Sequence, residues 1–123
     1  DTIDQVWWRH VFDSSQLLPH IPDSARQIVD LGSGAGFPGL VLSILLRERP
    51  GVRVHLVESH RRVSAFLRPG IGRTGAPALV HADRIDNVTL VGVDVVTSRA
   101  LAPLEDLLSY AEKYDCGHTQ CLF

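Results

Sequence analysis

Hydrophobic residues follow two spacings along this chain, short runs typical of strands and stripes typical of helices. The runs predict strands at residues 27–31, 52–58, 78–81, 94–98 and 119–123. Helical stripes occupy most of the intervals between them. Because strands and helices alternate, we expect an α/β fold: a parallel sheet with right-handed crossovers and helices on both faces.

A helix is predicted ahead of the first strand, over about residues 3–18, and Pro19 and Pro22 end it. Its stripe consists of Ile3, Val6, Trp7, His10, Val11, Ser14, Leu17 and Leu18. Pro38 marks the first turn of a second helix, since its fixed φ suits that position. Residues 40–46 of this helix are apolar nearly all round, so we expect it to be well buried.

Two further helices follow. One runs from about His60 to Arg68 and ends at Pro69-Gly70. Its expected core contacts are Val63, Phe66 and Leu67. The other covers about residues 103–114, and its expected apolar face is Leu104, Leu107, Leu108 and Ala111. Residues 83–87 are expected to form a turn or a short helical piece.

A glycine-dense turn, Asp30-Leu31-Gly32-Ser33-Gly34-Ala35-Gly36-Phe37-Pro38-Gly39, joins the first strand to the second helix. A turn of this kind, between a strand and a helix, is typical of nucleotide-binding domains. One frame, from Gly34 to Gly39, matches the dinucleotide pattern G-x-G-x-x-G. The other frame begins at Asp30 and continues through Gly32 and Gly34, which is the S-adenosylmethionine pattern. In both frames Glu58, at the end of the second strand, is placed to accept hydrogen bonds from ribose hydroxyls.

The charge of the cofactor distinguishes the two frames. A carboxylate beside the turn repels a pyrophosphate, whereas it stabilises the ammonium and sulfonium of S-adenosylmethionine. Asp30 therefore favours the methyl donor, and a dinucleotide-dependent oxidoreductase remains the alternative.

Length and composition bound the possibilities further. We expect one domain over residues 1–123, because 123 residues with 45% hydrophobic content suit a single core. No apolar run reaches the roughly 18–20 residues of a membrane span, and no signal segment opens the chain. The two cysteines suit a reducing cytosol, so we expect a cytoplasmic location. The absence of methionine indicates a fragment of a longer protein.

Charge is distributed unevenly. The net charge of −2 provides no overall basic surface for nucleic acid. Residues 61–84 nevertheless contain Asp83 as their only acid and five arginines: Arg61, Arg62, Arg68, Arg73 and Arg84. Two interpretations stay open, a solvated helix face and a local edge that contacts phosphates.

Three segments together resemble one family. Trp8-Arg9-His10-x-x-Asp13-Ser14, the turn from Asp30 to Gly39, and Thr97-Ser98-Arg99-Ala100 resemble the glucose-inhibited division protein B family. The resemblance implies a Rossmann-like class I methyltransferase that uses S-adenosylmethionine. It implies as substrate the N7 of a guanine in bacterial small-subunit (16S) ribosomal RNA. Relative to that family, the last strands of the sheet are expected to be truncated here.

The resemblance also implies cofactor contacts at Gly32, Phe37, Ile85-Asp86 and Arg99. Guanine N7 has an in-plane lone pair and no proton to lose, so its methylation needs alignment and no general base. Arg99 is accordingly expected to position the base, the cofactor or a phosphate, and these roles stay open. The alternative within this family is a non-catalytic RNA-associated domain.

Two smaller groups of polar residues were considered as sites. Arg9, His10 and Asp13 on the first helix form a polar cluster at a substrate cleft or, alternatively, a surface pair beside a packed histidine. The cysteines and histidine within residues 116–121 do not have the spacing of a zinc site, so no metal is expected.

Overall fold

The computed structural model describes residues 2–98 and 104–123, and their strands form one parallel sheet. The strands are β1 (Gln27–Leu31), β2 (Arg53–Val57), β3 (Ala78–His81), β4 (Val95–Ser98) and β5 (Gln120–Leu122). Their order across the sheet is β3-β2-β1-β4-β5, and every neighbouring pair is parallel. The predicted parallel sheet is confirmed, with strand bounds within one or two residues of the expected ones.

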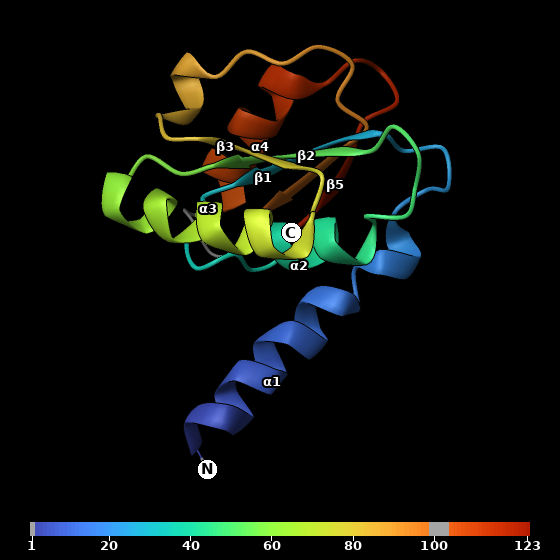
Figure 1. Cartoon of the computed structure of the whole chain (residues 1–123). Helices are drawn as coiled ribbons and strands as arrows, with labels where there is room; N and C mark the ends of the chain where they lie inside the picture. The colour runs from blue at the N-terminus through green and yellow to red at the C-terminus, as the bar shows by residue number, and fades with distance from the viewer. Residues whose placement is uncertain (1, 99–103) are drawn as a thin grey trace.

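Helices cover both faces of this sheet, as predicted (Figure 1). The helices are α1 (Thr2–Ser15), α2 (Gly39–Leu45), α3 (Arg61–Thr74) and α4 (Leu104–Tyr114). Two single turns of 3-10 helix, η1 (Leu18–His20) and η2 (Ile85–Asn87), lie between them. In Figure 1, α2 and α3 lie on one face, α4 and η2 lie on the other, and α1 extends away from the sheet.

The core has two layers because successive strand residues point to opposite faces. Ile28, Val54, Leu56 and Val95 pack on the α2 and α3 side together with Leu42, Leu46 and Leu67. Val29, Leu31, Val57 and Val96 pack on the α4 side together with Ala111 and Tyr114. Both faces of the central strands are therefore buried, which explains their nearly continuous apolar runs.

The third helix differs from the prediction. Instead of ending before Pro69, α3 continues through it to Thr74 and is closed by Gly75, whose φ is +66° and whose N–H bonds to the carbonyl of Ile71 at 3.0 Å. Pro69 lies on the exposed side of the helix. There the carbonyl that loses its partner can hydrogen-bond to water, so the proline is tolerated.

The burial of several individual helix residues was also predicted wrongly. Phe66, expected in the core, is 80% exposed, while Ser64 and Leu67 face the sheet. Leu108 of α4 is 48% exposed, and Leu45 of α2 is 44% exposed. Helical spacing allows more than one rotation of such a helix, and packing against the sheet selects one of them.

The first helix is shorter than expected, because α1 ends at Ser15 and η1 contains Pro19. Of the expected stripe, Ser14 is buried and donates a hydrogen bond to the carbonyl of His10 at 2.8 Å. The side chains of Ile3, Val6 and Trp7 lie outside those described.

A pair of histidines links β1, β2 and β3 on the α4 face of the sheet. His55, which is buried, has its Nε2 2.9 Å from Oε1 of Gln27 and its Nδ1 3.0 Å from Nε2 of His81. Since an amide oxygen can only accept, His55 donates through Nε2 and accepts through Nδ1. Burial, followed by the neighbouring His81 and Arg53, lowers the pKa of His55 to about 4.

Replacing His55 by glutamine is expected to remove one source of stability loss at low pH. Below its ordinary pKa of 6.5 the unfolded imidazole takes up a proton that the folded one does not, so His55 lowers the stability of the folded chain as pH falls. We expect His55 to contribute a loss of about 2 kcal/mol between pH 7.5 and 5. Urea unfolding at the two pH values measures it.

Buried Asp30 contributes with the opposite sign over this range, so the informative quantity is the difference between wild type and variant. Val91→Gln, at a position 90% exposed, is the control and should keep the wild-type pH profile. An equal loss of stability in His55→Gln and wild type would contradict the prediction.

Candidate cofactor-binding site

The connections reverse direction at β1. From this strand the chain proceeds to β2 and β3 on one side and then crosses to β4 on the other. At such a switch point the loops after the strands separate and leave a crevice beyond their carboxyl ends, where ligands of α/β proteins bind. A ligand is therefore expected at this edge of the sheet.

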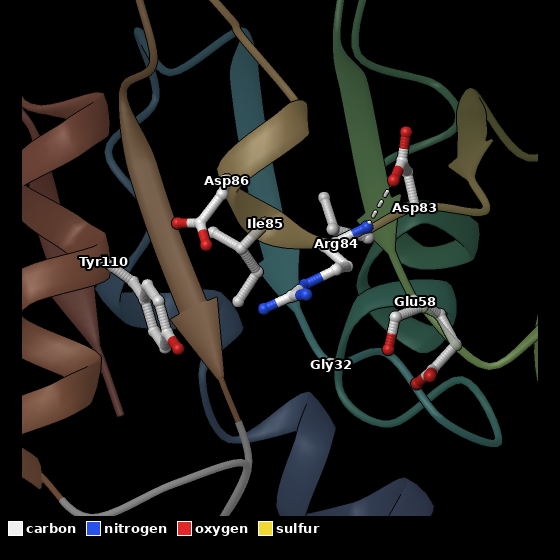
Figure 2. A pocket seen from close by; sticks show the side chains of 9 residues that line it. Gly32, Glu58, Asp83, Arg84, Ile85, Asp86 and Tyr110 are labelled. Carbon is white, nitrogen blue, oxygen red and sulfur yellow. Dashed lines mark hydrogen bonds between the residues drawn. The ribbon is translucent and has the colours of Figure 1, made fainter.

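A cleft lies there, formed by the segments that follow β1, β2 and β3 (Figure 2). Its lining residues are Gly32, Val57, Glu58, Ser59, Asp83, Arg84, Ile85, Asp86 and Tyr110. It holds about 610 Å³ of space, part of it open to solvent. Its place beyond the carboxyl ends of the strands is where a ligand of an α/β protein binds.

The glycine turn borders the cleft through Gly32. The N–H groups of Gly32 and Ser33 both donate to the carbonyl of Val57, at 2.8 and 3.1 Å, which ties the turn to the end of β2. Gly36 has a φ of +105°, and a Cβ there would lie 2.9 Å from Cβ of Leu40. The tight course of the turn therefore requires glycine at this position.

Asp30 lies beneath the turn and is fully buried. Its Oδ1 accepts from the Thr97 hydroxyl at 2.7 Å, and its Oδ2 accepts from the Gly39 N–H at 3.1 Å. Burial raises the pKa of Asp30 to about 6, against the lowering effect of these hydrogen bonds. Asp30 is not among the residues that line the cleft. Its observed contacts join β1, β4 and the start of α2.

Glu58 bridges the two sides of the turn. Its Oε1 accepts from the N–H of Gly34 and its Oε2 from the N–H of His60, both at 2.9 Å. The side chain is half-buried and lines the cleft. Each carboxylate oxygen can accept more than one hydrogen bond, so Glu58 can hold the turn and also receive hydroxyl groups from a ligand.

The segment after β3 forms the opposite wall and is held from α4. Lys113 donates through Nζ to the carbonyls of Ile85 and Asp86, both at 2.7 Å. The hydroxyl of Tyr114 donates to the carbonyl of Val88 at 2.9 Å. These bonds fix η2, and with it the backbone that faces the glycine turn across the cleft.

The expected cofactor residues separate into two groups. Gly32, Glu58, Ile85 and Asp86 line the cleft together. Gly34 contacts the cleft only through its bond to Glu58, and the ring of Phe37 packs against His10 with centroids 5.4 Å apart. Arg99 lies outside the described residues.

The expected substrate residues lie on α1, beside the turn rather than in the cleft. His10 contacts Phe37, whereas Asp13 lines a shallow hollow with Ser14, Leu17 and Pro38. Arg9 is exposed and makes no ion pair with Asp13 in the described structure. The helix is therefore adjacent to the glycine turn, but these three side chains do not form one polar cluster.

Five lining residues were not predicted as site residues: Val57, Ser59, Asp83, Arg84 and Tyr110. Arg84 had a signal, since it belongs to the arginine-rich segment, and its side chain points into the cleft between Glu58 and the η2 segment (Figure 2). Tyr110 had no such signal in the sequence, because an aromatic residue on an amphipathic helix is ordinarily a core residue.

Neither a metal cluster nor a membrane span is found in residues 2–98 and 104–123. No three His, Cys, Asp or Glu side chains gather there as metal ligands would. None of the described helices is both long and apolar enough to cross a bilayer. Both cysteines, Cys116 and Cys121, are free and exposed.

Comparison with solved structures places the fold. A putative S-adenosyl-L-methionine-dependent methyltransferase from Methanococcus maripaludis superposes with a TM-score of 0.69 at 11% identity, over 90% of this chain and 53% of that one. Coclaurine N-methyltransferase superposes with a TM-score of 0.68 at 16% identity, over 86% and 33%. At these identities the likeness concerns the fold, which is the predicted Rossmann-like methyltransferase fold.

Comparison with protein sequences is more specific. Residues 1–123 match the family described as rRNA small subunit methyltransferase G, GidB. A ribosomal RNA small subunit methyltransferase G from Parvibaculum lavamentivorans is 52% identical over 89% of this chain and 50% of its own length. The one from Paramagnetospirillum magneticum is 50% identical over 100% and 58%. The chain thus spans about half the length of the curated relatives it matches. Because the family match covers every residue, the chain belongs to the rRNA small subunit methyltransferase G family.

Proposed function

We propose that the protein containing this chain transfers a methyl group from S-adenosylmethionine to N7 of a guanine in small-subunit ribosomal RNA, in the cytoplasm. The observation that carries the proposal is the cleft at the switch point of a chain of this family. The names of the relatives, which call them small-subunit ribosomal RNA methyltransferases, support the substrate class.

The residues of the cleft suit this cofactor. Gly32 presents backbone without a side chain to the cleft, and the Glu58 carboxylate is placed to receive ribose hydroxyls. Asp83 and Asp86 add negative charge to the lining, and only Arg84 opposes it. Such a lining favours a cationic ligand over a pyrophosphate, which weighs against the dinucleotide alternative.

When bound, the cofactor supplies an electrophilic methyl group on a sulfonium. Transfer to N7 would form a carbon–nitrogen bond and break the carbon–sulfur bond, with the positive charge passing from sulfur to the guanine. No proton leaves in this step, so the chain needs no general base at N7. The residues of the chain align the methyl group with N7 and exclude other orientations of the two groups.

In this proposal Asp30 acts as a positioning residue. Its two hydrogen bonds hold the strand ends on either side of the switch point, and its buried charge lies beneath the turn. Thr97 and Ser98 fasten β4 to β1 in the same way, since the Ser98 hydroxyl donates to the carbonyl of Leu31 at 3.0 Å. Arg99, next in the chain, is proposed to position the base, the cofactor or a phosphate. The α1 residues Arg9, His10 and Asp13 are proposed to face the RNA.

The direct test is methyl transfer by the full-length protein from labelled S-adenosylmethionine to small-subunit ribosomal RNA. Digestion to nucleosides and mass spectrometry should place the label in N7-methylguanosine. Cells lacking the gene should lose that nucleoside at one position. Binding of RNA without any transfer would instead support the non-catalytic alternative, and calorimetric binding of NAD in place of S-adenosylmethionine would support the oxidoreductase.

Lys113→Met is expected to weaken cofactor binding although Lys113 does not line the cleft. The substitution keeps the length of the side chain and removes both hydrogen bonds to the η2 carbonyls, so the wall of the cleft loosens. We expect the Kd for S-adenosylmethionine to rise about five- to tenfold, the equivalent of one net hydrogen bond. Isothermal titration calorimetry measures it.

Glu112→Gln, one residue away and exposed, is the matched control and should bind as the wild type does. Unchanged affinity in Lys113→Met would show that η2 keeps its position without the lysine.

A further inference from the structure

The solvent-facing side of α3 carries positive charge without any compensating acid on the same helix. Residues 61–74 contain four arginines and no aspartate or glutamate. Arg61, Arg62, Arg68 and Arg73 are all exposed, and none forms an ion pair with a described residue. Asp83, in the segment after β3, has a pKa lowered first by the hydrogen bonds from Asn87 and the Arg84 N–H, and further by the charges of Arg61 and Arg84. Arg62, Arg68 and Arg73 are without such a partner.

An aromatic ring lies in the middle of these arginines. Phe66 is 80% exposed, although a phenylalanine at this spacing was expected in the core. Arg62, Phe66, Pro69 and Arg73 follow one another at intervals of four, three and four residues, so they share one side of the helix. The buried residues Ser64 and Leu67 lie on the opposite side. We call the exposed side, Arg62, Phe66, Pro69 and Arg73, the α3 stripe.

The α3 stripe begins beside the cofactor cleft. The helix starts at Arg61, just after Glu58 and Ser59, which line the cleft. From there α3 runs along the outside of the sheet, on the face that α2 also covers (Figure 1). The twelve residues from Arg62 to Arg73 extend over about 16 Å of helix. A strand of RNA laid along this length would present its phosphates to the arginines and one end to the cleft.

We propose that the α3 stripe is an RNA-docking surface: Arg62 and Arg73 contact phosphates, and Phe66 stacks on an unpaired base. The proposal rests on the proposed function, since it places the RNA substrate of that same site. Aromatic rings set among basic residues are the means by which proteins hold single-stranded nucleic acid. Charge complementarity selects this occupant over a second copy of the chain, because two copies of the stripe would bring arginines together.

The test compares RNA binding by the full-length protein and two variants, using a fluorescent single-stranded fragment of small-subunit RNA. Arg62→Gln/Arg73→Gln is expected to weaken binding about tenfold at 0.15 M salt and to reduce the slope of log affinity against log salt by about 1.4, which corresponds to two phosphates. Phe66→Ala is expected to weaken binding at least about fivefold, and Phe66→Tyr to restore it, because tyrosine also stacks.

Arg47→Gln is the matched control, since this exposed arginine lies outside α3 and already has Glu48 at 3.8 Å. Its RNA affinity should equal that of the wild type. The Kd for S-adenosylmethionine should stay unchanged in every variant, because no residue of the stripe lines the cleft. Circular dichroism should show that each variant keeps the fold, because the substituted side chains are exposed.

RNA affinity within twofold of the wild type in both the double arginine variant and Phe66→Ala would overturn the proposal. So would loss of binding to phosphatidylglycerol vesicles while RNA affinity is kept, which would assign the stripe to an anionic membrane. If the stripe variants lose RNA affinity but the wild type transfers no methyl group, the surface stands and the proposed function fails. If the wild type transfers methyl groups but the stripe variants keep their RNA affinity, the proposed function stands and the docking surface fails.

Discussion

Replacing Gly39 by alanine is expected to lower the free energy of unfolding by about 3–5 kcal/mol. A Cβ at this position would collide with the carboxylate of Asp30 and would lie 2.5 Å from Cδ2 of Leu56. Both neighbours are fully buried. Relief of the collision would separate the Gly39 N–H from Asp30 and leave a buried carboxylate with one partner fewer. Urea unfolding followed by circular dichroism measures the loss.

The matched control is Gly72→Ala, in α3, where an added Cβ meets nothing within 4 Å. Because alanine favours helix over glycine, this variant is expected to be up to about 1 kcal/mol more stable than the wild type. If Gly39→Ala unfolded within 1 kcal/mol of the wild type, the close packing of the turn on Asp30 would be refuted.

Replacing Glu58 by alanine is expected to raise the Kd for S-adenosylmethionine about 10- to 100-fold, or about 1.4–2.8 kcal/mol. The variant loses the acceptor proposed for the ribose hydroxyls, and charge-assisted hydrogen bonds of this kind are among the stronger ones. It also releases the N–H groups of Gly34 and His60, so the turn is less ordered before binding. Calorimetric titration of the full-length protein measures the change.

Glu58→Gln separates charge from shape. Its amide oxygen can still accept from one N–H, so we expect a Kd between those of the wild type and Glu58→Ala. Glu48→Ala, at an exposed carboxylate that pairs with Arg47, is the control and should leave binding unchanged. Wild-type affinity in Glu58→Ala would remove Glu58 from the cofactor site.

Much of the cleft was predictable because strand ends are visible in the sequence. Gly32 and Glu58 directly follow apolar runs and meet at one edge once the strands are parallel, whereas Ile85 and Asp86 were predicted from the family resemblance. Arg84 and Tyr110 were not predicted to join them. Arg84 enters because its loop folds over the cleft, and Tyr110 enters because α4 packs on the opposite face of the sheet.

Helix orientation was the least predictable feature. The α3 sequence is compatible with Phe66 pointing inward, and Pro69 is an ordinary signal for the end of a helix. The packing of Leu67 against the sheet turned Phe66 and Pro69 outward together. This rotation of α3 exposes the ring of Phe66, places Pro69 on the side where a proline is tolerated, and creates the α3 stripe.

By itself the sequence determined the parallel α/β sheet, the glycine turn at its centre and the family, because local spacing and short motifs carry that information. The tertiary structure alone decided the surroundings of Asp30. From the sequence its carboxylate was expected to face the cofactor, but packing buries it against Thr97 and Gly39. Burial depends on which elements pack against a residue, and local sequence does not show this. Thr97, which packs against Asp30, lies 67 positions away in the chain.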